Sequence, residues 1–149
     1  METTKGKIKF IDITKPTKAD IESLEKTYGF HKIILNELER PSARPRVENY
    51  DDYLYFIYYF PTYDTQEKTS RTAEIDFLIT KTAVIVVHYE PIEALEQFKT
   101  MEFDSSLDLA YQIITSLFEF QERQLQHIRE KVEYIGSALF KNNERPVLE

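Results

Sequence analysis

Four stretches of the chain have the hydrophobic patterns of β-strands. Residues 53–60 form an unbroken apolar and aromatic run that ends at Pro61, and residues 83–88 form a second unbroken run. Such runs are typical of strands that are buried on both faces. Residues 72–80 alternate between apolar and polar, and residues 7–13 do so incompletely. The pattern predicts four strands, with residues 53–60 as a central strand of a sheet that carries helices on both sides.

The connections between these strands have weaker signals. Lys81 and Thr82 separate the alternating strand from the next one, and so short a connection implies an antiparallel hairpin. Lys-Thr is not the Gly- or Asn-rich sequence that such turns prefer, so we expect a somewhat longer loop. Residues 61–70 are predicted to be a polar loop. Glu74 and Asp76 lie on the face of the alternating strand opposite its apolar side chains.

Three helices are expected before residue 105. The first follows Pro16, where the Thr17 side chain can accept a hydrogen bond from the amide three residues on and Asp20 places negative charge near the helix start. Gly29 is suited to end it. Two shorter helices are predicted at residues 31–39 and 91–99.

The last predicted element is one long helix. Ser105 can cap it, with Asp108 in a capping-box relation, and residues 107–140 contain no proline. At about 1.5 Å per residue it spans roughly 50 Å, more than the diameter of a compact domain of this size. Beyond Gln121 its apolar side chains form a narrow stripe: Leu125, Ile128, Val132, Ile135 and Leu139. We expect this distal part to project and to pack on a following helix or a neighbouring subunit.

Together these elements predict a single α/β domain over residues 1–149. Its core, about residues 1–103, is expected to be an α/β/α sandwich with a mixed parallel and antiparallel sheet. A long C-terminal stalk helix, about residues 105–140, follows the core. The blunt ending of the sequence favours a soluble part excised from a longer protein.

Composition excludes several classes of protein. The 149 residues carry a formal net charge of -7 and no cysteine. An acidic chain is a poor partner for nucleic acid, which is bound through basic patches, and a chain without cysteine has no thiolate chemistry or disulfide. The first residues lack the apolar core of a signal peptide, and no stretch reaches the roughly 20 apolar residues of a membrane span.

No catalytic motif is present in the sequence. Its three glycines cannot build a phosphate-binding loop, and no serine lies in a nucleophile elbow. His31, His88 and His127 are not at metal-site spacing, and His88 is expected at a strand end with its ring bonded to nearby backbone. The charged residues that precede the central strand are expected to form salt bridges that order this segment: Arg44, Arg46, Glu48, Asp51 and Asp52.

The acidic and amide side chains of the second helix are the candidate metal ligands. Asn36, Glu37 and Glu39 are oxygen donors, which suit the hard cations Mg²⁺ and Ca²⁺. Taken alone, such residues are more often a solvated helix surface, because charged side chains are mostly exposed. The composition does not decide between these two interpretations.

Several segments together resemble the cytoplasmic domain of CorA-type magnesium transporters. They are His31 to Leu38, Arg44-Pro45-Arg46-Val47-Glu48, Tyr53-Leu54, Ile75 to Lys81 and Val86-Val87-His88. The similarity extends from about Ile8 to Ile135 in the order and spacing of that family. The two membrane helices and the Gly-Met-Asn motif of the family are absent from these residues.

The resemblance implies an ion-sensing role on the cytoplasmic side of a cell membrane. In the family, five identical subunits assemble, and Mg²⁺ held between neighbours favours the closed state; Co²⁺ or Zn²⁺ can replace Mg²⁺ as the transported ion in some members. By position, Glu37 matches the principal acid and Asn36 its neighbour. A further family acid corresponds to Thr115, which places the second cation site in doubt. The expected partners are therefore divalent cations and identical subunits, with the membrane reached only through the absent helices.

Two other functions stay open at this point. The chain could belong to a zinc-exporting relative, because ion selectivity is set near the pore of such proteins. It could also be a stand-alone soluble module whose long helix binds a partner protein. An enzyme is the weakest alternative, since no residue set favours catalysis.

Overall fold

A mixed β-sheet forms the centre of the domain. The computed structural model describes residues 1–3, 7–41, 44–64, 66–67 and 69–141. The strands of this described part are β1 (Glu2–Thr3), β2 (Lys9–Thr14), β3 (Val47–Asn49), β4 (Tyr53–Asp64), β5 (Thr69–Thr80) and β6 (Ala83–His88). The helices are α1 (Lys18–Tyr28), α2 (Lys32–Glu37), the 3₁₀-helix η1 (Glu93–Thr100) and α3 (Ser106–Phe140). The sequence's final residues, 142–149, on which the expectation of an excised chain rests, lie outside this part.

The strands lie in the order β1-β2-β6-β5-β4-β3. β2 and β6 pair in parallel, and the other neighbours pair antiparallel. The parallel pair requires a crossover, which the chain makes through the helices and the β4–β5 hairpin. The predicted mixed sheet is confirmed.

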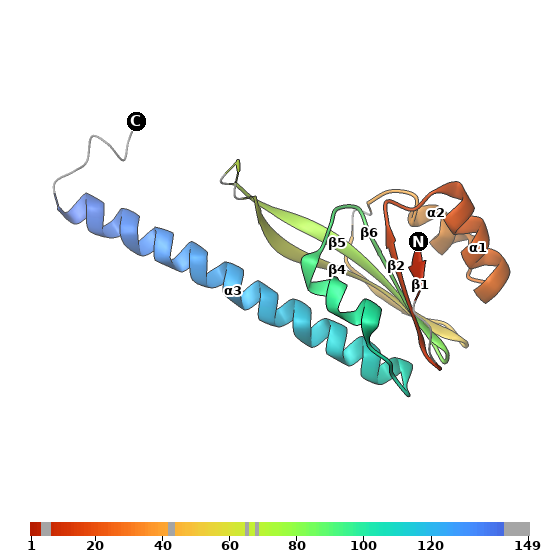
Figure 1. The fold of residues 1–149 in the computed structure, drawn as a ribbon. Helices are drawn as coiled ribbons and strands as arrows, with labels where there is room; N and C mark the ends of the chain where they lie inside the picture. Colours follow the sequence, from red (N-terminus) through yellow and green to blue (C-terminus); the bar gives the residue numbers. More distant parts are fainter. Residues whose placement is uncertain (4–6, 42–43, 65, 68, 142–149) are drawn as a thin grey trace.

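Helices cover both faces of the sheet (Figure 1). One face packs on α1 and α2, in a cluster that includes Ile13, Leu24, Leu35 and Ile85. The opposite face packs on η1 and the first half of α3, in a cluster centred on Phe77. Because each face has its own apolar core, β4 and β6 need apolar side chains on both sides, and the predicted α/β/α sandwich is confirmed.

The first helix has the ends that the sequence predicts. The Thr17 hydroxyl accepts from the Asp20 amide at 3.3 Å, and the Asp20 carboxylate accepts from the Thr17 amide at 2.8 Å, which completes a capping box. The Thr17 amide and hydroxyl lower the pKa of Asp20, an effect that outweighs its partial burial. Gly29 ends the helix at a φ of 66°, a left-handed conformation that glycine adopts without steric cost.

We expect Thr17→Ala to lower the free energy of unfolding by about 1 kcal/mol, because it leaves a helix-start amide without its acceptor. Urea denaturation followed by circular dichroism measures this change. Thr27→Ala, on the exposed surface of the same helix, is the matched control and should not destabilise the domain. Equal losses in the two variants would contradict the capping role.

The hairpin between β4 and β5 is longer than predicted. Residues 61–70 were expected to be a polar loop, but β4 continues to Asp64 and β5 begins at Thr69. Pro61 is tolerated because its backbone nitrogen faces the side of β4 on which β3 lies, and β3 pairs with β4 only from Leu54 to Phe56. The Ile57 amide, which points to the same side, bonds the Arg46 carbonyl just beyond these pairs. A proline lacks an N–H, which costs no ladder bond at an open edge.

Two other local predictions differ from the structure, one in the connection after β5 and one in the start and type of a helix. The connection after β5 is the two residues Lys81 and Thr82 rather than a longer loop. The Thr80 hydroxyl closes it by accepting from the amides of Thr82 and Ala83 at 3.2 and 2.9 Å, so a side chain replaces the usual turn chemistry. The helix predicted at residues 91–99 is the 3₁₀-helix η1, which begins at Glu93.

The long helix α3 extends beyond the domain (Figure 1). Ser105 is its N-cap, but its side chain makes no capping hydrogen bond, and the Asp108 carboxylate instead accepts from Gln112. The capping box expected at this end is therefore absent. The distal stripe is exposed at 51%, 63%, 46% and 40% for Leu125, Val132, Ile135 and Leu139, as the prediction of a projecting helix requires. Within the residues described, no helix combines the length and apolarity that crossing a bilayer needs.

Candidate functional site

The three predicted cation ligands lie at the end of α2 and just after it. Asn36 and Glu39 are exposed, and the Glu37 side chain is 34% exposed. The apolar side of this helix is buried on the sheet through Ile34 and Leu35, so its polar side faces outward. The structure thus presents these oxygen donors at the domain surface, on the face of the sheet opposite α3.

Glu37 is not a free carboxylate, because Arg46 pairs with it. The Arg46 guanidinium contacts both Glu37 and Glu48, and it lies 5.3 Å from the centre of the Tyr55 ring. The Tyr50 hydroxyl donates to Glu48 at 2.5 Å. That bond and Arg46 lower the pKa of Glu48, whereas the same bond raises the pKa of Tyr50 to about 12. The expected salt bridges before the central strand are confirmed for Arg46 and Glu48.

The donor set suits a hard cation only in part. Carboxylate and amide oxygens are the ligands that Mg²⁺ prefers, but Arg46 occupies the Glu37 carboxylate. The described residues bring no three Asp, Glu or His side chains together in a metal-holding arrangement. Within the described part of the chain, these donors make up at most part of a cation site.

Thr115 does not lie near Glu37. It is half-buried on α3, beside a hollow of about 220 Å³ that Gln97 and Ser116 also line. The Gln97 amide donates to the Ser116 hydroxyl at 2.7 Å across this hollow. Because α2 and α3 cover opposite faces of the sheet (Figure 1), the two family positions do not meet within one chain.

The histidines lie in three separate places. The His31 ring caps α2 by accepting from the Ile33 amide at 3.3 Å, and His127 is exposed on α3. His88, at the end of β6, bonds the Glu90 carbonyl at 2.6 Å, as predicted for a strand-end histidine. Its other nitrogen lies 2.6 Å from Asp12, a partner that sequence reasoning missed.

Asp12 and His88 form a buried charged group with Lys99. Asp12 is 6% exposed and His88 2%, and the Lys99 ammonium lies 3.3 Å from the second Asp12 oxygen. Burial by itself would raise the pKa of Asp12, but His88 and Lys99 together lower it below its usual value. The group joins β2, β6 and η1. Its signal in the sequence is a lone Asp within the apolar run of the first strand.

A second buried acidic group lies on the opposite face of the sheet. Glu74 and Asp76, on β5, are 6% and 1% exposed. The alternation along β5 predicts a polar face for them, but α1 and α2 cover that face. Burial, followed by the neighbouring Glu74 carboxylate, raises the pKa of Asp76 to about 8. We call these two residues the acid pair.

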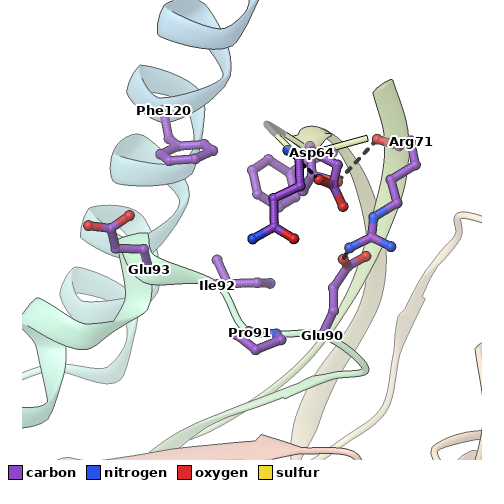
Figure 2. A pocket seen from close by; sticks show the side chains of 10 residues that line it. Asp64, Arg71, Glu90, Pro91, Ile92, Glu93 and Phe120 are labelled. Carbon is purple, nitrogen blue, oxygen red and sulfur yellow. Dashed lines mark hydrogen bonds and ion pairs between the residues drawn. The ribbon is translucent and has the colours of Figure 1, made fainter. Parts of the chain in front are cut away.

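The hollow in Figure 2 lies between the β4–β5 hairpin and α3. Its volume is about 340 Å³, with Phe60, Ile92 and Phe120 among its lining residues. Arg71 pairs with Glu90 at 2.6 Å. The Asp64 carboxylate accepts from two backbone amides at 2.9 and 3.0 Å, which lower its pKa. These charges already have partners, and the lining contains no nucleophile beside a base.

Solved structures that resemble this fold include a complete transporter and two separately solved domains. The complete CorA magnesium transporter of Methanocaldococcus jannaschii matches with a TM-score of 0.75 at 20% identity, over 95% of this chain and 46% of that chain. The soluble domain of the same protein matches with a TM-score of 0.73 at 20% identity, over 95% and 59%. The ZntB cytoplasmic domain of Vibrio parahaemolyticus RIMD 2210633 matches with a TM-score of 0.67 at 18% identity, over 86% and 55%.

The family follows from the sequence itself. Residues 5–149 match the family described as CorA-like Mg2+ transporter protein, and the chain belongs to that family. It is therefore related to transporters and not to enzymes. The comparison with curated proteins found no match. The chain spans about half the length of the solved structures it resembles.

Proposed function

We propose that this chain is the ion-sensing regulatory domain of a CorA-like transporter of divalent cations, on the cytoplasmic side of the membrane. Mg²⁺ held between neighbouring subunits would favour the closed state. The observation that carries the proposal is the family match over residues 5–149. The oxygen donors at the end of α2 support it, because they face outward, where a second subunit can reach them.

The proposed regulation is a shift between two arrangements of identical subunits. Acidic surfaces that face one another repel, and a divalent cation between them removes that repulsion. The ion can shift the equilibrium only through its preference for the bridged arrangement. Part of a site on Asn36, Glu37 and Glu39 provides such a preference, since its missing ligands would come from the neighbour. The ion would share the Glu37 carboxylate with Arg46.

The projecting part of α3 supports an assembly with other helices. Its apolar stripe repeats every three or four residues and faces solvent in the single chain. A helix with such a stripe gains stability by packing on another helix. In the proposed homopentamer, the stripe would pack on a following segment or on a neighbouring subunit.

We expect the isolated chain to be monomeric or weakly associated, and Mg²⁺ to promote its association. Light scattering during a Mg²⁺ titration measures this. Glu37→Gln should raise the Mg²⁺ midpoint by about tenfold, the effect of about 1.4 kcal/mol of binding free energy. Glu22→Gln, exposed on α1, is the control of equal charge. An unchanged midpoint in the Glu37 variant, or a stable pentamer without Mg²⁺, would contradict the proposal.

The same titration distinguishes the transported-ion alternatives. Co²⁺ and Zn²⁺ are compared with Mg²⁺ at equal ionic strength. Association at a much lower Zn²⁺ concentration, again dependent on Glu37, would favour a zinc-transporting relative. Association that no divalent cation changes would favour a stand-alone interaction module.

A further inference from the structure

The acid pair is buried between the sheet and α2, and the hydrogen bonds of Asp76 are long. The Asp76 Oδ2 atom lies 3.4 Å from the Tyr55 hydroxyl and 3.5 Å from the Tyr89 hydroxyl, both at the outer limit for a hydrogen bond. Among the residues described, Oδ1 has no hydrogen-bond partner. A buried carboxylate oxygen without a donor is costly, so this environment favours the neutral form of the group.

The influence of Tyr89 on Asp76 depends on where its hydroxyl proton lies. Its hydroxyl lies 3.1 Å from the Leu38 carbonyl, which is closer than Asp76. A phenol has one O–H to donate. When that proton goes to Leu38, the phenol oxygen turns a lone pair toward Asp76. Only a protonated Asp76 can then donate to Tyr89, so the two bonds form a chain from Asp76 through Tyr89 to the C-cap residue of α2.

In the part of the chain that the structure describes, the other charged and titratable groups around Asp76 do not supply a neutralising cation. From β5 comes Glu74, which also bonds Tyr59, and from β4 comes Tyr55. From the α2 side, Glu37 and Arg46 act on Tyr55, and the Arg46 guanidinium is engaged by Glu37 and Glu48. Burial and Glu74 are the largest influences that disfavour a charge on Asp76, and the weak tyrosine bonds oppose them.

We propose that Glu74 and Asp76 hold one proton between them, and that this proton fastens α2 to the sheet. While it is bound, the carboxyl group of one residue donates to the carboxylate of the other or to Tyr89. When it is released to water, two carboxylates face each other in a buried space, and the Asp76 charge faces the Tyr89 oxygen. The Tyr89 hydroxyl can then donate to only one of Asp76 and Leu38, so its hydrogen bond to the end of α2 becomes weaker.

This makes the α2 end of the domain sensitive to protons. The end that loosens carries Leu38, which follows directly after the proposed cation ligand Glu37. The proton site itself lies on β5 and needs no metal ion and no second subunit. The proposal of a proton site can therefore be tested independently of the proposed function.

Carbon-13 NMR of the side-chain carboxyl groups of the whole 149-residue chain tests the proton site directly. The Asp76 signal, assigned by its loss in Asp76→Asn, should titrate above about pH 6, at least two units above an ordinary aspartate. If the variant does not fold, selective labelling of aspartate in the wild-type chain still reveals any such high titration. A set of aspartate signals that all titrate near about pH 4 would overturn the proposal.

Hydrogen exchange tests the connection to α2. After correction for intrinsic exchange, protection of the Leu35 and Leu38 amides should fall about tenfold between about pH 6 and pH 9 in the wild type. In Asp76→Asn it should stay constant, because no charge develops. Asp52→Asn, on an exposed loop, is the control and should keep the wild-type response. The same fall in Asp76→Asn would overturn the role of the acid pair in holding α2.

Discussion

Replacing Asp12 by alanine is expected to lower the free energy of unfolding by about 3–5 kcal/mol. The substitution leaves His88, 2% exposed, without its carboxylate partner, while the Lys99 ammonium keeps Glu96 at 2.7 Å. Removing one partner of a buried charged group costs more than its pairing energy, because the remaining groups stay desolvated. Since β2, β6 and η1 meet at this carboxylate, the whole sheet should unfold at lower denaturant concentration.

Chemical denaturation of the wild type and of Asp12→Ala measures this loss. Asp51→Ala, on an exposed loop, is the matched control and should change stability by no more than about 0.5 kcal/mol. The folded-state pKa of Asp12 is lowered, so its contribution is present above about pH 4 and is lost as the pH falls through the folded value. The variant should therefore show a flatter loss of stability in acid. A loss below about 1 kcal/mol at neutral pH would contradict the argument.

The hydrophobic pattern predicted the layers of the fold because both faces of β4 and β6 are buried. In a chain without a membrane-length apolar segment, a short unbroken apolar run bounded by turn residues favours a strand covered on both sides. The alternating pattern of β5, in contrast, was misleading. Alternation usually indicates one solvated face, yet Glu74 and Asp76 lie under α2, and the sequence does not state which face a helix covers.

The exposure of single residues in the candidate site could be predicted from the sequence, but the contacts between them could not. Exposure of Asn36 and Glu39 follows from the amphipathic pattern of α2. The pairing of Glu37 with Arg46 does not follow from this pattern, because it depends on how the end of α2 packs beside the residues that precede β3. Asp12, His88 and Lys99 come from three elements that only the parallel β2–β6 pair brings together. Contacts of that kind are set by topology, which local patterns do not encode.

Phe77→Ala should destabilise the domain by about 3–5 kcal/mol, a large part of the about 5–15 kcal/mol of a typical domain. Phe77 is fully buried on β5 where this strand pairs with both β4 and β6, and its ring stacks on Phe56 with centroids 4.5 Å apart. Truncation leaves a cavity between the sheet and α3 that these rigid elements cannot close. Phe140→Ala, 93% exposed on α3, is the matched control and should cost little in urea denaturation. Similar losses would mean that this face of the sheet is not the apolar core on which α3 depends.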